Sequence, residues 1–354
     1  MPSPLISVVI PTFNRAYCLQ RAVDSALNQS YRNVEVIVVD DGSTDETRDL
    51  LRAAYSMDGR VRYVHQANSG VCFARNHGFA LAQGEFISLL DSDDEWYPWK
   101  LAVELACLNV VPNAGMIWTD MDAVGPDGAV VQPKYLKTMY DAYQRLGQRV
   151  LFDQHWDIGD VMPDCPAAIA GARLSAGDIF SEMILGNLVH TSTVLLRRDC
   201  LQRVKGFNLD LKVSGEDYDF HLRTCREGPV AFLDASSIRY QIGMGDALTR
   251  PEHMIHLALN NLQTVLAALR TDRARIRLPG RMINARIASS YLWVGQAHLD
   301  LGDARKARPF LLKGLWREPN RLHAWALLIL SCFPNRLRRG FRNLVRLLKR
   351  RLKS

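Results

Sequence analysis

Residues 34–43 read VEVIVVDDGS, an apolar and mostly β-branched run that ends in two aspartates and a glycine. A run that is apolar at successive positions predicts a strand buried on both faces. Similar runs occupy Ile6–Ile10, where Pro11 is expected to end the strand, Val61–Val64 and Phe86–Leu90. Segments with helical periodicity separate these runs, so the first hundred residues predict a mostly parallel sheet with helices on both faces.

Helix-start signals and apolar spacing place the helices between these strands. Apolar residues recur at helical spacing over 19–27, which predicts the first helix. Ser43 followed by Glu46 has the spacing of a capping box, so the second helix is expected to begin at Ser43. A third helix is predicted over Gly70–Ala82, whereas residues 130–188 have no assignable pattern.

The chain changes character near Ala247–Pro251. Before this point, strands are predicted over 193–197 and 230–233, with a helix over 216–226. After it, every patterned segment is helical: 253–270, 283–301, 304–317 and 322–332. We therefore predict three parts, an α/β domain, an all-α domain and a basic tail, over residues 1–248, 249–334 and 335–354.

Charge is concentrated at the end of the chain. The net charge is +7, and residues 335–354 contain nine Lys or Arg and no acidic residue, which leaves −2 for residues 1–334. A near-neutral body is not expected to bind nucleic acid across its folded surface. Seven scattered cysteines without a CxxC pair indicate neither a disulfide framework nor a zinc site, and favour a reducing cytoplasm. The N-terminus has no pattern of a signal peptide.

Three quoted segments carry a family resemblance: SVVIPTFNRAYCLQRAVDSALNQSYRNVEVIVVDDGSTDET (7–47), QANSGVCFARNHGFALAQGEFISLLDSDDEWYPWKL (66–101) and GFNLDLKVSGEDYDFHLR (206–223). In this order they resemble the inverting glycosyltransferases of family 2. The resemblance covers residues 5–245. It implies the GT-A nucleotide-diphospho-sugar transferase fold and transfer of a sugar from a nucleotide donor.

The triplet Asp91-Ser92-Asp93 looks like the DXD motif of that family. A departing diphosphate gains negative charge, which a cation such as Mg²⁺ or Mn²⁺ held by carboxylates can neutralise. The resemblance implies that Asp91 reaches the ribose or the metal and that Asp93 binds the metal. An isolated acidic triplet would more often be a solvated loop, but here the flanking strand and EWYPWKL match the family context. Asp94 is expected to be a helix cap ahead of Pro98.

The resemblance also implies a donor pocket. A carboxylate accepts hydrogen bonds, so Asp41 suits the N–H of uracil or a guanine edge, and Asp40 is expected only to form a turn. Arg75 is expected to face the ribose or diphosphate, with a surface salt bridge as the alternative. The remaining residues expected to bind the nucleotide are Pro11, Thr12, Asn14, Asp91 and Ser92.

Glu216-Asp217 matches the ED motif of the family. Asp217 is predicted to be the general base, because a sugar hydroxyl attacks well only when its proton is removed. The alternative is a carboxylate that only stabilises a helix N-terminus, and Glu216 is the weaker candidate base. Metal-dependent relatives carry a histidine after the last strand, which IRYQIGMGD lacks. The expected structural histidines are His190, His221 and His253.

Trp96 and Trp99 flank the acidic loop and are the tryptophans favoured for stacking on an acceptor sugar, although core packing is the more common role. In the C-terminal domain, residues 291–319 have the spacing of one tetratricopeptide-like hairpin, with Gly314 where alanine is usual. The tail places six apolar residues on one helical stripe among arginines and lysines, which suits an anionic membrane surface. Packing of this stripe on the body is the alternative.

We therefore predict a metal-dependent, membrane-peripheral glycosyltransferase on the inner face of the cytoplasmic membrane. It would act in polysaccharide biosynthesis, moving a sugar from a UDP-sugar to a glycan or lipid-linked glycan. A nucleotidyltransferase shares a similar sheet, but it would need a Gly-rich basic loop where this chain has PTFNR over 11–15. A degenerate scaffold subunit is the non-enzymatic alternative, and the presence of Asp91, Asp93 and Asp217 together argues against it.

Overall fold

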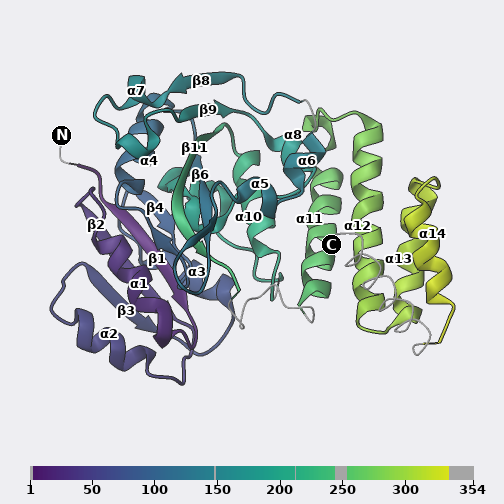
Figure 1. Cartoon of the computed structure of the whole chain (residues 1–354), viewed down its shortest axis with the longest axis horizontal. Helices are drawn as coiled ribbons and strands as arrows, with labels where there is room; N and C mark the ends of the chain where they lie inside the picture. The colour runs from purple at the N-terminus through teal and green to yellow at the C-terminus, as the bar shows by residue number, and fades with distance from the viewer. Residues whose placement is uncertain (1–2, 147–148, 212, 244–252, 335–354) are drawn as a thin grey trace. The chain divides into compact units, whose positions relative to one another are not determined.

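The computed structural model describes residues 3–146, 149–211, 213–243 and 253–334. The chain divides into two compact units, Met1–Ala247 and Leu248–Ser354 (Figure 1). Among the described helices, none is long and apolar enough to cross a membrane. The tail predicted over 335–354 lies outside the described residues.

A mixed sheet of eleven strands forms the core of the first unit. Four strands are parallel neighbours in the order β3-β2-β1-β4: β1 (Ile6–Thr12), β2 (Val34–Asp40), β3 (Val61–His65) and β4 (Phe86–Leu89). The sheet continues with β10 (Leu195–Arg197), β6 (Met116–Val124), β11 (Val230–Gln241), β9 (Arg173–Gly177) and β8 (Gln154–Asp157). β10 runs antiparallel to both of its neighbours, and β11 is parallel to β6. Two short strands, β5 (Glu95–Trp96) and β7 (Val130–Gln132), pair with β11 and β6. The predicted α/β fold is confirmed.

Helices alternate with the first strands as their periodicity predicts: α1 (Ala16–Leu27), α2 (Thr47–Tyr55), α3 (Val71–Leu81) and α4 (Lys100–Val110). The segment that the sequence left unassigned is built from short helices around β7 to β9: α5 (Leu136–Met139), α6 (Ala142–Leu146), α7 (Ile158–Val161) and α8 (Phe180–Met183). Two further helices precede the last long strand, α9 (Arg198–Val204) and α10 (Glu216–Arg226). Helices of one turn have little periodicity, which explains why residues 130–188 were unreadable.

Pro11 does not end the first strand, contrary to expectation. β1 continues to Thr12, whose carbonyl oxygen accepts a hydrogen bond from the Asp41 N–H on the side of β2. Backbone groups alternate sides along a strand, so the Pro11 nitrogen faces β4, whose pairing with β1 already ends at Leu89. A proline is tolerated there because no ladder bond needs its missing N–H.

The predicted capping box at Ser43 is also wrong. α2 begins four residues later, at Thr47, and Ser43 lies in the turn after β2. The Ser43 N–H donates to Asp40 Oδ1, which confirms the turn expected for Asp40, and Ser43 Oγ accepts from the Asn14 N–H. A tertiary contact with the loop after β1 therefore uses the side chain that a cap would have needed.

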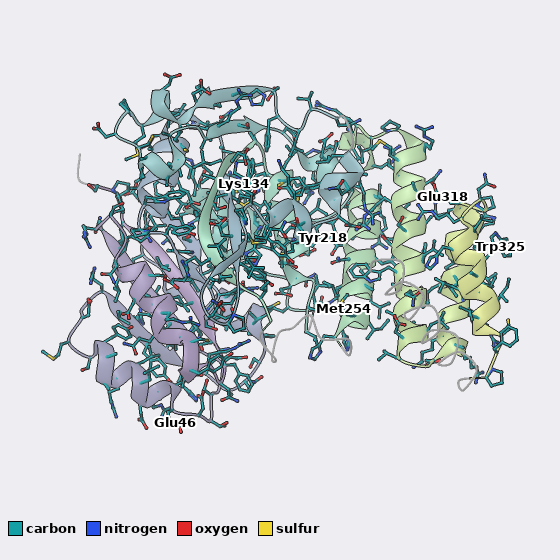
Figure 2. All side chains as sticks on the ribbon, viewed as in Figure 1. Glu46, Lys134, Tyr218, Met254, Glu318 and Trp325 are labelled. Carbon is teal, nitrogen blue, oxygen red and sulfur yellow. The ribbon has the colours of Figure 1, made fainter. Side chains whose placement is uncertain are left out.

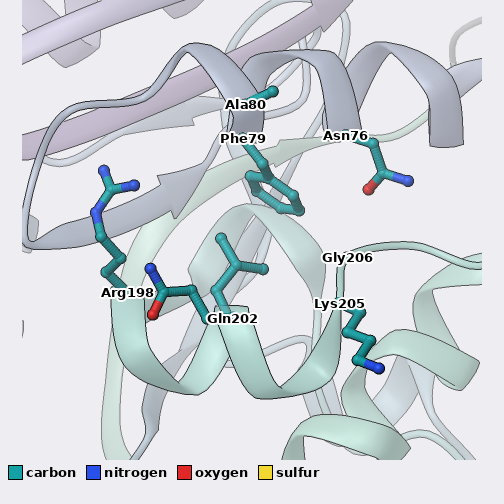
Figure 3. Close-up of a pocket in the computed structure, with 8 residues that line it drawn as sticks. Asn76, Phe79, Ala80, Arg198, Gln202, Lys205 and Gly206 are labelled. Atoms are coloured by element: carbon teal, nitrogen blue, oxygen red, sulfur yellow. The ribbon is translucent and has the colours of Figure 1, made fainter.

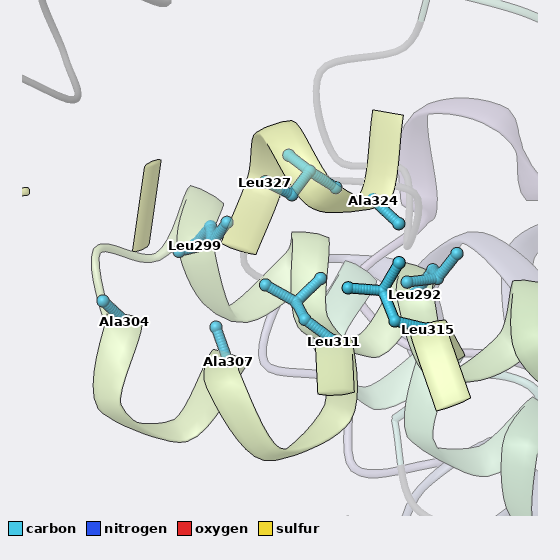
Figure 4. Packing of buried hydrophobic residues seen from close by; sticks show 8 residues of the cluster. All are labelled: Leu292, Leu299, Ala304, Ala307, Leu311, Leu315, Ala324 and Leu327. Carbon is cyan, nitrogen blue, oxygen red and sulfur yellow. The ribbon is translucent and has the colours of Figure 1, made fainter. Parts of the chain in front are cut away.

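Four helices make up the described part of the second unit: α11 (Met254–Thr271), α12 (Gly280–Asp300), α13 (Ala304–Arg317) and α14 (Leu322–Ser331). α12 and α13 pack closely through two glycines. A Cβ added to Gly295 would lie 2.7 Å from Leu311, and one added to Gly314 would lie 2.7 Å from Leu292. Leucines and alanines of α12, α13 and α14 form the core beside this contact (Figure 4). Gly314 therefore departs from the repeat pattern because no side chain fits there.

Candidate active site

Arg75, on α3, joins two acidic segments that are far apart in the sequence. Its Nη2 lies 2.7 Å from Asp91 Oδ1, and its Nη1 lies 2.8 Å from Glu216 Oε1. The guanidinium is buried and lies over the ring of Phe207, 4.9 Å from the centroid. The alternative of a surface salt bridge is therefore wrong. Arg75 holds together the loop after β4 and the start of α10, the two segments that carry the predicted metal ligands and base.

The loop after β4 presents carboxylates of two kinds. The side chains of Asp91 and Asp93 are 28% and 30% exposed, so both can reach a ligand. Burial acts to raise the pKa of Asp91, but the Arg75 guanidinium brings that pKa below its ordinary value. Asp94 is buried, and burial together with Asp93 and Asp91 raises its pKa well above the ordinary value.

Asp94 is not the expected helix cap. Its Oδ2 accepts a 2.5 Å hydrogen bond from Ser192 Oγ, and the same hydroxyl oxygen accepts the Asp91 N–H at 3.0 Å. α4 begins only at Lys100 and has no side-chain cap. Asp94 and Ser192 therefore tie the acidic loop to the segment before β10, and they fix where Asp91 lies.

Asp217 is the second residue of α10. The residue before this helix, Gly215, has a left-handed backbone conformation with a φ of 87°. Its Oδ2 accepts a hydrogen bond from Asn187 Nδ2 at 3.0 Å. Burial, with Glu216 next to it, raises the pKa of Asp217 to about 7. The helix dipole would favour the ionised form, but here desolvation is the larger effect. Glu216 is buried against Arg75, which leaves Asp217 as the carboxylate that can take a proton near neutral pH.

The Asp41 carboxylate is already engaged by the loop before α3. Oδ1 accepts from Gln66 Nε2 at 2.7 Å and from the Ser69 N–H at 2.9 Å, and Oδ2 accepts from the Gly70 N–H at 2.8 Å. A carboxylate has about four acceptor positions, so one stays available for a base. The structure thus gives Asp41 a role in loop positioning that sequence reasoning did not anticipate.

The other predicted nucleotide residues lie on the loops beside Asp41. Thr12 ends β1 and its buried hydroxyl has no hydrogen-bond partner, while Pro11 precedes it within the strand. Asn14, with a φ of 51°, accepts the Thr44 N–H at its Oδ1 and so connects the loops after β1 and β2. Ser92 is buried between the two exposed aspartates. An unpartnered buried hydroxyl is rare and is consistent with a ligand that completes its bonding.

Sequence reasoning missed Asn187, which holds the Asp217 carboxylate. His190, expected to be structural, packs edge-on against Tyr240 at 5.0 Å between ring centroids. Burial lowers the pKa of His190 to about 4, so its ring is neutral. Tyr240 stacks on Tyr135 at 6.2 Å. Asn187 lies in the segment without a readable pattern, so no motif marked it.

Of the two tryptophans favoured for stacking on an acceptor, Trp96 is unsuitable. It is buried, donates its Nε1–H to the Ser192 carbonyl oxygen, and its ring centroid lies 4.4 Å from Lys100 Nζ. It cannot stack on a sugar. Trp99 stacks on Tyr97 and remains partly exposed.

A separate pocket of about 320 Å³ lies between α3 and α9 (Figure 3). Phe79, Leu201, Arg198 and Lys205 are among its lining residues. It includes Asn76 but neither Arg75 nor any carboxylate of the two acidic segments. The pocket therefore does not belong to the site described above.

Comparison with known proteins shows what the chain is similar to. Residues 7–162 match the sequence model of the family described as Glycosyl transferase family 2. The N-terminal unit is therefore similar to glycosyltransferases of family 2. This domain is 30% identical over 230 residues to an uncharacterized glycosyltransferase of Rickettsia typhi. The match covers 65% of this chain and 61% of that relative, so the chain spans less than two thirds of its length.

Two solved structures have the same fold as this chain. S. aureus TarS 1-349 in complex with UDP-GlcNAc is 17% identical, with a TM-score of 0.52, and the match covers 96% of this chain and 92% of that one. The mannosyltransferase PcManGT from Pyrobaculum calidifontis, in complex with GDP-Man and Mn²⁺, is 18% identical. Its TM-score is 0.54, with 94% and 87% of the two chains covered. The predicted GT-A fold is confirmed.

Proposed function

We propose that the protein transfers a sugar from a nucleotide-diphosphate donor, expected to be a UDP-sugar, to a hydroxyl group of a glycan or lipid-linked glycan. The transfer would serve polysaccharide biosynthesis. The observation that carries the proposal is the Arg75 bridge, which joins a loop of exposed carboxylates to a carboxylate whose pKa is raised to about 7. The carboxylates of the loop suit a divalent cation that binds the donor diphosphate, and the carboxylate of Asp217 suits removal of a proton from an acceptor hydroxyl.

The acidic loop fits a divalent cation such as Mg²⁺ or Mn²⁺. Asp91 and Asp93 would hold it through partly exposed carboxylates, which lie beside Arg75 and Arg15 respectively. When bound, the cation would neutralise the charge that develops on the departing diphosphate. Within the described ranges no group of three or more His, Cys, Asp or Glu side chains is arranged to hold a metal. Diphosphate oxygens would therefore have to complete the coordination.

The donor would lie along the ends of β1, β2 and β4. Asp41 would accept a hydrogen bond from the base, and the free hydroxyl of Thr12 would bond to the nucleotide. Arg75 can still use its unpartnered Nε, although both Nη atoms are taken by carboxylates. We therefore assign Arg75 mainly to positioning Asp91, and only secondarily to the diphosphate. UDP-GlcNAc in the TarS complex and Mn²⁺ in the PcManGT complex support this choice of donor and metal class.

Asp217 would act as the general base. A hydroxyl of the acceptor would lose its proton to Asp217 as the hydroxyl oxygen attacks the anomeric carbon. One base and one in-line displacement give an inverted anomeric configuration. Asn187 donates to Oδ2 and so fixes the orientation of the carboxylate.

A panel of UDP- and GDP-sugars tests the proposal. In the absence of an acceptor, one donor should be hydrolysed slowly, and only with Mn²⁺ or Mg²⁺ present. The matched control is Asp217→Asn, which should bind the same donor and release little nucleotide. Absence of binding to every donor would favour a degenerate scaffold subunit. Formation of UTP or GTP and a sugar 1-phosphate, when pyrophosphate is added to the same donors, would favour a nucleotidyltransferase.

The tail would hold the enzyme on the anionic inner face of the cytoplasmic membrane. Its nine basic residues each contribute at most about 1 kcal/mol near such a surface, and the contribution weakens with salt. Deleting residues 335–354 should weaken binding to phosphatidylglycerol vesicles and leave donor binding intact. Phe341→Ser with Leu348→Ser should weaken attachment at unchanged charge. Full-length protein that stays in the supernatant at low salt would contradict this role.

A further inference from the structure

Helix α14 is apolar on all sides, yet only one side is covered. Its sequence, LHAWALLILS, contains no charged residue. Ala324 and Leu327 are buried in the core shared with α12 and α13. A helix that is apolar all round normally lies inside a protein or a membrane. The uncovered side of α14 therefore calls for a partner.

We define the α14 outer face as Leu322, Trp325, Ile329 and the following Phe333, which recur at helical spacing. Leu322 is 83% exposed, Ile329 57%, Phe333 47% and Trp325 44%. Figure 2 shows Trp325 on the outer side of α14. On the neighbouring helix α13, Trp316 is 82% exposed. Two exposed tryptophans within ten residues are unusual on a water-facing surface.

The charges around this face are almost all positive. Residues 304–354 contain fifteen Lys or Arg and a single acidic residue, Glu318. On α13 the exposed basic side chains are Arg305, Lys306, Arg308 and Lys313. A partner that suits both the apolar face and its surroundings must offer apolar contact and negative charge together.

We propose that the α14 outer face, together with Trp316, is a docking surface for an anionic lipid bilayer. A bilayer interface supplies acyl chains for the leucine and isoleucine, a polar boundary that tryptophan favours, and anionic headgroups for the basic side chains. α14 has ten residues, about 15 Å of helix, against about 30 Å of hydrocarbon. It would therefore lie in the interface and not cross it.

Other occupants fit the charge pattern less well. A second copy of the chain would bring the same positive charges face to face. Residues 335–354 of the same chain would do likewise, because their nine basic residues would approach those of α13. The proposal is independent of the sugar-transfer reaction, and it adds a surface of the folded domain to the one proposed for the tail.

Tryptophan fluorescence of the full-length protein tests the proposal with vesicles of phosphatidylglycerol and phosphatidylcholine. Brominated acyl chains should quench the emission, because they quench only tryptophans that enter the bilayer. Trp316→Phe with Trp325→Phe should keep vesicle binding and lose most of this quenching. Trp316→Ser with Trp325→Ser should weaken vesicle partitioning by at least about tenfold. Met57→Ser, at a 95% exposed residue of the other unit, is the matched control and should change neither readout.

Two results would overturn the proposal. One is unchanged vesicle binding of the double serine variant, with circular dichroism showing that the variant is folded. The other is wild-type emission that brominated lipid does not quench. If the double serine variant instead converts a dimer into a monomer in sedimentation, without changing vesicle binding, a second copy covers the face. Donor hydrolysis should be unaffected in every variant, which keeps this test separate from that of the reaction.

Discussion

The two acidic segments of the site are built alike but end with different roles. In the loop after β4, Arg75 pairs with Asp91, and nearby Asp94 has a raised pKa. At the start of α10, the same arginine pairs with Glu216, and the adjacent Asp217 has a raised pKa. The Arg75 guanidinium therefore pairs with one carboxylate in each segment and not with its neighbour, which is Asp94 in the first segment and Asp217 in the second.

The difference between the two unpaired carboxylates lies in access. Asp94 is 2% exposed and its Oδ2 is bonded to Ser192, so no acceptor can reach it. Asp217 is partly exposed, and the neutral amide of Asn187 donates to its Oδ2. A raised pKa marks both residues, but only Asp217 can exchange a proton with a ligand. The comparison teaches that a carboxylate with a raised pKa indicates a general base only where a ligand can reach its oxygen.

The largest effect should come from Asp217→Asn. The variant keeps size and the contact with Asn187 but cannot accept a proton, so turnover should fall by about 10²–10⁴-fold. Donor affinity measured by calorimetry should stay close to that of the wild type. Near-normal turnover would assign the base to another group, with Glu216 next.

Removal of the metal or of its ligand should have the next largest effect. With Mn²⁺ present, Asp93→Ala should weaken donor binding by more than about tenfold, because the diphosphate charge is no longer neutralised. Treating the wild-type protein with EDTA should weaken binding similarly. Equal affinity with and without metal in calorimetry would rule out the cation.

A moderate effect is expected in the pH profile of turnover. Wild-type turnover should rise with pH and level off above about pH 7, because Asp217 must be deprotonated to act as a base. Glu216→Gln removes a negative charge that raises this pKa, so the rise should move to lower pH by up to about one unit. An unchanged midpoint would show that burial alone sets the pKa of Asp217.

The smallest effect is expected from Asp94→Asn, which imitates the protonated acid that burial favours. Turnover should change by less than about tenfold, and stability by about 1 kcal/mol or less. The raised pKa means that ionisation of wild-type Asp94 costs stability as pH rises above its unfolded value. The thermal stability of Asp94→Asn relative to the wild type should therefore increase between pH 5 and pH 8, as measured by thermal melts. A loss of turnover as large as that of Asp217→Asn would contradict the different roles proposed for Asp94 and Asp217.

Local sequence predicted the elements whose side chains repeat regularly. The apolar runs of β1 to β4 and the apolar stripes of α11 to α14 identify those strands and helices, because burial on one or both faces imposes a period on the chain. The sequence also predicted most of the proposed site residues, because they follow the ends of strands within recognisable motifs. Residues 130–188 were not, because their helices of four or five residues have no period to read.

Only the tertiary structure decided what each polar side chain does. Sequence assigned Ser43 and Asp94 to helix caps, but contacts with Asn14 and Ser192, 29 and 98 residues away, fixed their actual roles. The Arg75–Glu216 pair spans 141 residues, and Asn187 reaches Asp217 from a segment without a motif. A hydrogen bond or a desolvated charge depends on which group lies within about 3 Å, and the chain order does not specify that neighbour. The sequence therefore determined the fold and which residues we propose for the chemistry, and the packing of distant segments determined the partners and the pKa values of those residues.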